Sequence, residues 1–253
     1  MRPYILAETN YKAVKDQKFE VAVLPWGATE AHNYHLPYFA DAIQADRISA
    51  ESARIAWEKG AKVIVLPTIP YGVNTGQYDI PLDMNMNPGT QMAVLTDIIE
   101  VLDRNGIKKL VVLNCHGGND FRQMLRELGG MFPDMFLCQV NFYQVLDKKK
   151  YFEEDGDHAD EMETSLILWW YPELVLPKNE AGEGKAKKFR IQALNENWAW
   201  TERKWSQVTE DTGIGDPKNA SADKGKRYFK DLTRKIGNFL YDLAETDPDN
   251  MYE

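Results

Sequence analysis

Three short segments of the chain gather carboxylate and imidazole side chains at spacings that suit a catalytic divalent metal ion. The first carries Glu30, His32 and Asp41, directly after the apolar run 21–25. Carboxylate oxygens and imidazole nitrogens can bind such an ion while leaving coordination positions free for water. One Glu-x-His pattern is weak evidence by itself, because a histidine after a strand is more often a structural residue.

The other two segments strengthen the metal hypothesis. The second is NCHGGN, residues 114–119, which contains His116 and also follows an apolar run. The third, residues 157–165, opens a helical stretch and contains His158 and Glu163. The chain has only four histidines, and all of them lie in these three segments: His32, His35, His116 and His158. This concentration favours one shared metal site.

Alternating apolar and amphipathic stretches predict the elements that position these side chains. The expected strands are 20–25, 62–67, 108–114 and 135–142, and the expected helices are 45–59, 90–104, 120–129, 160–171 and 221–243. Continuous Val/Ile/Leu strands separated by helices indicate a mostly parallel sheet with helices on both faces. We therefore expect the α/β class, as a single three-layer α/β/α domain spanning residues 1–253.

Such a sheet would bring the polar segments together. Ligands in open α/β sheets bind beyond the carboxyl ends of the strands, where Glu30, His32 and His116 fall. Gly117 and Gly118 would let the backbone approach closely at the turn between strand and helix.

Capping and loop patterns give further expectations. Thr90 and Ser221 are candidate N-caps of their helices. Two long segments, 73–88 and 178–215, have no regular pattern. The second contains Trp198, Trp200 and Trp205, so it is expected to be either a lid or a subunit contact.

Composition narrows the functional class. A formal net charge of −9 disfavours binding of nucleic acid through bulk electrostatics. No apolar run approaches the roughly 20 residues of a membrane span, and the first residues lack the apolar core of a signal peptide. Two cysteines are too few for a disulfide framework. A cytoplasmic enzyme acting on a small molecule, without nucleic-acid or membrane partners, is the expectation.

The segments described so far resemble the creatininase family (creatinine amidohydrolases and relatives). The matching pieces are LPWGATEAH (24–32), HLP (35–37), Asp41, NCHGGN (114–119), His158-Ala159, ETS (163–165) and GDP (215–217). In order and spacing they cover roughly residues 20–230. The combination is specific, although no single piece would be.

The resemblance implies a creatininase-like fold and two divalent ions per chain, zinc or manganese, with iron as a further option. It implies that Glu30 and His116 hold one ion, that His32 holds the other, and that Asp41 bridges the pair. Two such ions would activate a water molecule for attack on an amide-like carbonyl, cyclic or linear. His158 would carry the proton to the leaving nitrogen. The resemblance also implies a homo-oligomer, with a hexamer favoured.

Two departures from the creatinine-hydrolysing branch matter. Where that branch has a glutamate ligand two residues after the histidine of the second segment, this chain has Gly118. Glu163 is the expected replacement ligand, with a helix-surface carboxylate as the alternative. The tryptophans that cover creatinine in that branch are also missing, because residues 151–156 contain none. Creatinine itself is therefore not expected as the substrate.

Weaker candidates and other functions remain open. His35 is expected to orient a ligand or bind substrate, and Asn114 and Asn119 either shape the site or serve turn geometry. Apart from an amidohydrolase, the sequence allows a hydrolase of a keto-cyclitol or related carbonyl compound. It also allows a non-catalytic, metal-stabilised binding protein.

Overall fold

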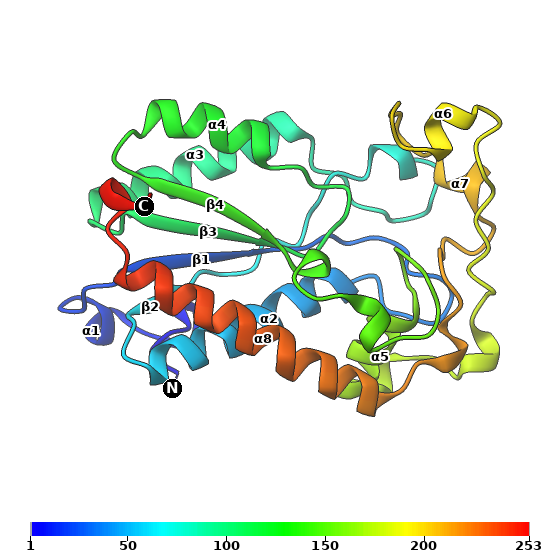
Figure 1. Cartoon of the computed structure of the whole chain (residues 1–253), viewed down its shortest axis with the longest axis horizontal. Helices are drawn as coiled ribbons and strands as arrows, with labels where there is room; N and C mark the ends of the chain where they lie inside the picture. The colour runs from blue at the N-terminus through cyan, green and yellow to red at the C-terminus, as the bar shows by residue number, and fades with distance from the viewer. Residues whose placement is uncertain (1, 253) are drawn as a thin grey trace.

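A single parallel sheet forms the centre of the molecule, shown as a computed structural model that describes residues 2–252 (Figure 1). The strands are β1 (Val21–Trp26), β2 (Val63–Val65), β3 (Lys109–Asn114) and β4 (Phe136–Asn141). They are arranged in the order β2-β1-β3-β4, and every neighbouring pair is parallel. The predicted parallel α/β sheet is confirmed.

Helices cover both faces of this sheet. On one face lie α3 (Pro88–Arg104) and α4 (Arg122–Met131); on the other lie α2 (Ala40–Glu58), α5 (Glu161–Trp170) and α8 (Ala222–Glu245) (Figure 1). Side chains of β1 alternate between the two layers, since Val21 and Val23 join the core on the α2 and α8 side and Leu24 joins the core on the α3 side. A strand that is apolar on both faces can be buried only in a three-layer arrangement, which confirms the expected α/β/α class.

The remaining elements are short. They are the helices α1 (Tyr11–Val14), α6 (Gln192–Asn195) and α7 (Trp205–Val208), and the 3-10 turns η1 (Leu6–Glu8), η2 (Thr75–Gln77), η3 (Phe142–Gln144), η4 (Lys148–Lys150), η5 (Pro172–Leu174), η6 (Lys178–Glu180), η7 (Pro217–Asn219) and η8 (Pro248–Asn250). The two segments predicted to be irregular contain only such short pieces. Within residues 2–252, no helix has the length and apolar character needed to cross a membrane.

Two helix starts differ from the prediction. Helix α2 begins at Ala40 rather than at residue 45, because its first turns bury the polar side chains of Asp41 and Gln44 and so hide the apolar periodicity. Helix α3 begins at Pro88, a residue whose fixed φ suits the first helical position, so Thr90 lies inside the helix and the predicted cap was wrong. Ser221 does cap α8, since its side chain accepts a hydrogen bond from the Lys224 N–H at 3.3 Å.

Helix α8 fixes α5 at a close crossing. A Cβ atom at Gly225 would collide with the backbone carbonyl of Ser165, so only glycine allows this approach. Near the crossing, the ammonium group of Lys224 pairs with the buried Glu161 carboxylate at 2.5 Å. These contacts hold the first turn of α5, which carries Glu163, in a defined position.

Candidate metal centre

The side chains predicted to bind metal meet at the carboxyl edge of the sheet. Strands β1 and β3 are neighbours and end in register at Trp26 and Asn114, so the loops that follow them start side by side. Asp41 and Glu163 come from the first turns of α2 and α5. The structure brings together all five predicted donors, each at most 6% exposed: Glu30, His32, Asp41, His116 and Glu163.

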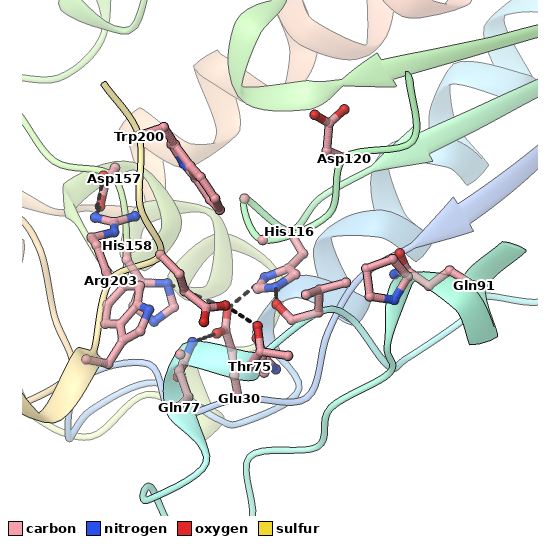
Figure 2. Close-up of a pocket in the computed structure, with 18 of the residues that line it drawn as sticks. Glu30, Thr75, Gln77, Gln91, His116, Asp120, Asp157, His158, Trp200 and Arg203 are labelled. Carbon is pink, nitrogen blue, oxygen red and sulfur yellow. Dashed lines mark hydrogen bonds and ion pairs between the residues drawn. The ribbon is translucent and has the colours of Figure 1, made fainter. Parts of the chain in front are cut away.

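The first donor group is centred on His116. Its Nδ1 atom lies 2.9 Å from Glu30 Oε1, a contact visible in Figure 2, and 3.0 Å from Asp41 Oδ2. The Nε2 atom of the same ring lies 3.0 Å from the Val73 carbonyl oxygen, to which it donates when the ring is neutral. Nδ1 then presents a lone pair to two carboxylate oxygens. Three acceptor atoms that converge in a buried space fit a divalent cation.

The second donor group repeats this arrangement around His32. Its Nδ1 atom lies 3.1 Å from the Glu30 carbonyl oxygen, and its Nε2 atom lies 3.2 Å from Asp41 Oδ1 and 3.9 Å from Glu163 Oε2. The two oxygens of Asp41 therefore face different imidazoles. Among the described residues, Asp41 Oδ2 is buried without a hydrogen-bond donor, and a cation would satisfy it.

The pKa values of two histidines indicate that the donor cluster favours positive charge. Burial acts to lower the pKa of His32, but the carboxylates of Asp41 and Glu163 outweigh it and raise the pKa to about 10. Burial also opposes charge on His116, yet Glu30 and Asp41 raise its pKa well above the usual value. Metal ions would supply the same charge in place of these protons.

His158 lies beside both groups but is oriented differently. Its Nε2 atom lies 2.8 Å from the Ala31 carbonyl oxygen, and its Nδ1 atom lies 3.7 Å from Glu30 Oε1. The ring packs against that of His32, with 4.2 Å between the centroids. Glu30, His32 and His158 are close enough to hold an ion themselves, and the free Nδ1 could equally exchange a proton with a bound molecule.

Glu163 also shapes the loop that carries His158. Its Oε2 atom accepts a hydrogen bond of 2.6 Å from the Ala159 N–H. Ala159 has a φ of 50°, in the left-handed region that residues with a Cβ atom seldom adopt. Burial raises the pKa of Glu163, and His32 opposes that effect. Glu163 is buried and its Oε2 lies 3.9 Å from His32 Nε2, so it is not the helix-surface carboxylate that was the alternative.

The other predicted polar residues lie around the donors. Asn114 accepts the His116 N–H at 3.2 Å, and Asn119 donates to Asn114 at 3.0 Å, so both asparagines shape the His116 loop. His35 bonds to Thr164 Oγ1 at 2.8 Å instead of to any of the five donors. A Cβ atom at Gly118 would collide with the His116 ring, which explains the glycine there.

Sequence analysis missed two glutamines that hold the donors. The amide of Gln77, from η2, donates to Glu30 Oε2 (Figure 2). The amide of Gln44 donates to Glu163 Oε1 at 3.2 Å. Gln44 lies one helical turn after Asp41, so helical spacing could have indicated it once α2 was known to begin at residue 40. Nothing in the sequence singles out Gln77.

A cavity of about 820 Å³ opens onto this cluster. Glu30, His116 and His158 form its polar end. Its other walls come from the irregular segments and the start of α4, and include Val73, Pro88, Met124, Trp200 and Trp205. The volume lies within the range of about 300–1,000 Å³ that is typical of small-molecule sites.

Comparisons with known proteins identify the family to which this chain is similar. A model of the creatininase family, described as creatinine amidohydrolase, matches residues 6–240. A creatinine amidohydrolase from Pseudomonas putida is 30% identical over 176 residues, which are 61% of this chain and 66% of that protein. A mycofactocin precursor peptide peptidase from Mycobacterium tuberculosis is 26% identical over 249 residues, which are 90% of this chain and 87% of that protein.

A solved structure of a Bacteroides fragilis protein, provisionally assigned as a creatinine amidohydrolase, is 40% identical with a TM-score of 0.94, and the match covers 100% of both chains. A creatininase structure with 22% identity and a TM-score of 0.78 shows the same fold over 96% of this chain. Together with the buried donor clusters, these matches define a hydrolase that acts on C–N bonds. The chain belongs to the creatininase family.

Proposed function

We propose that this protein is a dinuclear, divalent-metal-dependent amidohydrolase that cleaves an amide-like C–N bond, cyclic or linear, of a small molecule. The observation that carries the proposal is the position of Asp41, whose two oxygens face two different imidazoles at 3.2 and 3.0 Å. A carboxylate placed in this way can bridge two ions. Glu30 and His116 would complete one site, and His32 and Glu163 the other.

The ions, when bound, polarise a carbonyl group and make water a nucleophile at neutral pH. The surrounding residues hold the donor side chains in position. The amide of Gln77 orients Glu30, and the Val73 and Glu30 carbonyls fix the rings of His116 and His32. These buried partners keep the donors in place before an ion arrives.

His158 is proposed as the proton shuttle. With Nε2 held by the Ala31 carbonyl, the Nδ1 lone pair can take a proton from the attacking water. The same atom then delivers that proton to the nitrogen that leaves as the C–N bond breaks. Water and an amide thus give a carboxylic acid and an amine, with His158 returned to its initial state.

The named relatives support a C–N bond as the target, since one is named for creatinine and another for a precursor peptide. Creatininase structures include forms described as Zn-Zn and Mn, and we propose these two metals here as well. Both cysteines, Cys115 and Cys138, are free in the described part of the chain, as a cytoplasmic location would require.

Metal content tests the proposal. Elemental analysis of the protein after loading with zinc or manganese should give close to two ions per chain. Asp41→Asn should lower the content most, because one side chain serves both sites. Asp46→Asn is the matched control, since Asp46 is exposed on the same helix and should leave both ions bound. At most one ion per chain in the loaded wild type would exclude the dinuclear mechanism.

His158→Ala tests the shuttle separately. Both ions should stay bound, because the five donors are intact. Turnover should fall on the order of 10²–10⁴-fold, which is the usual contribution of a general acid–base. Loss of an ion from this variant would show that His158 is a ligand.

A further inference from the structure

One wall of the cavity comes from within residues 198–208, which we call the strap; the lining residues there lie between Trp200 and Trp205. Trp200 lines the cavity from the strap, yet 87% of this residue is exposed. Figure 2 shows its indole on the opposite side of the cavity from Glu30 and Gln77. A large apolar ring that stays open to water beside a buried polar cluster is a surface available to a ligand.

Contacts on the C-terminal side of Trp200 hold the strap in place. Glu202 accepts a hydrogen bond from the hydroxyl of Thr75 in η2, and Arg203 pairs with Asp157 at 2.9 Å. Trp205 packs edge-on against the ring of His158, with 4.7 Å between the centroids. These contacts hold the chain next to Trp200 at the cavity, so the indole stays beside the site while its ring remains open to a ligand.

The shape and lining of the cavity indicate what Trp200 would contact. A space of about 820 Å³ is large enough for a drug-sized molecule, far bigger than one five-membered ring. Pro88 and Met124 add apolar surface to a lining that also contains charged side chains such as Asp120, Glu202 and Arg203. A ligand that reaches from the donors to Trp200, on the opposite side of the cavity, needs a reactive amide and, some distance away, a group that can lie against an indole.

We propose that Trp200 determines specificity by stacking on a planar apolar side chain of a linear, peptide-like amide whose scissile C–N bond lies at the donor cluster. This inference rests on the proposed hydrolase function, and it assigns the substrate class. Aromatic pairs of this kind prefer offset-stacked or edge-to-face geometry, which an exposed indole on one side of a cavity can offer.

The test uses the metal-loaded protein and the peptides acetyl-X-Gly, in which X is Gly, Leu or Phe. Wild type should have the highest kcat/KM for Phe. Trp200→Ala should lower kcat/KM for the Phe peptide about 10-fold, equal to about 1.4 kcal/mol. The value for the Gly peptide, the metal content and the native mass should not change.

Trp198→Ala is the matched control. Trp198 is 75% exposed on the same strap, but its indole donates to Glu196 at 2.9 Å and does not line the cavity. This variant should behave like wild type with every peptide. An equal effect of both variants, an equal loss on all peptides, or a smaller native mass for Trp200→Ala would overturn the proposal.

Binding separates this inference from the proposed function. If wild type binds two ions but cleaves none of the peptides, the linear, peptide-like substrate class is ruled out while the amidohydrolase proposal stands, and calorimetry with acetyl-Phe-Gly decides the role of Trp200. Affinity about 10-fold weaker in Trp200→Ala would support the inference. Equal affinity in both proteins, or no binding to wild type, would overturn it.

Discussion

At the scale of a single residue, Glu163 contacts both the donor cluster and the loop that carries His158. One oxygen lies 3.9 Å from His32 Nε2 and also accepts the Ala159 N–H, next to His158. The donor cluster and the loop of the proposed shuttle therefore share one carboxylate. A substitution of Glu163 that keeps an oxygen for the Ala159 N–H should change metal binding without changing the loop that carries His158.

Glu163→Gln is such a substitution, because a glutamine oxygen can still accept the Ala159 N–H but binds a cation poorly. We expect one of the two ions to be lost while the fold survives, and activity to fall with the lost ion. Elemental analysis and circular dichroism measure the two effects. Glu173→Gln, an exposed change in η5, should leave both ions bound. Retention of two ions by Glu163→Gln would remove Glu163 from the ligand set.

The five donors were predicted through the resemblance to the creatininase family, which assigned the matching positions; the sequence by itself showed only that suitable side chains follow two strands and open a helical stretch. Gln77 could not be predicted, and for Trp200 the sequence left a lid and a subunit contact open. They lie in irregular segments whose conformation depends on contacts with distant residues, such as the bond between Thr75 and Glu202. The sequence therefore indicated the metal donors but did not decide whether the Trp-rich segment lines the cavity.

At the scale of elements, the crossing of α5 and α8 sets the position of Glu163. It depends on Gly225, where any Cβ atom would meet the Ser165 carbonyl. The sheet and most helices were predicted from apolar patterns. The start of α2 was not, because burial of Asp41 and Gln44 at the site interrupts the pattern that marks a helix.

Gly225→Ala should destabilise the protein by about 1–3 kcal/mol, the usual cost of overpacking. Gly129→Ala, within helix α4, should have the opposite effect on stability. In the described part of the chain, nothing lies within 4 Å of a Cβ atom there, so the change should stabilise by about 0.5–1 kcal/mol. Urea denaturation measures both. Equal effects of the two substitutions would show that the crossing is looser than described.

At the scale of the whole molecule, exposed apolar side chains gather on two linked segments. Tyr34 and Phe39 are 60% and 47% exposed, and Tyr78 and Leu82 are 70% and 75% exposed. The hydroxyl of Tyr38 joins the segments through a bond of 2.8 Å to the Pro81 carbonyl. Because Trp200 lines the cavity, we propose this surface, and not the strap, as the main contact of a homo-oligomer, with a hexamer favoured.

Leu82→Asp tests that contact. Leu82 has a φ of 64°, which aspartate tolerates better than most residues, so the change adds charge with little backbone strain. Light scattering should show an oligomer for wild type and a smaller species for the variant, with metal content retained. Val101→Asp, on the exposed side of α3, should keep the wild-type mass. A monomeric wild type at micromolar concentration would rule out the proposed assembly.

None of the five donors lies in the strap; they come from residues 30, 32, 41, 116 and 163. The donors and the proposed specificity residue therefore lie in separate parts of the sequence. A lineage could acquire a new substrate by altering Trp200 while the donors stay unchanged. Trp205 would have to be kept in any exchange of the strap with loops from relatives, because its ring packs against that of His158.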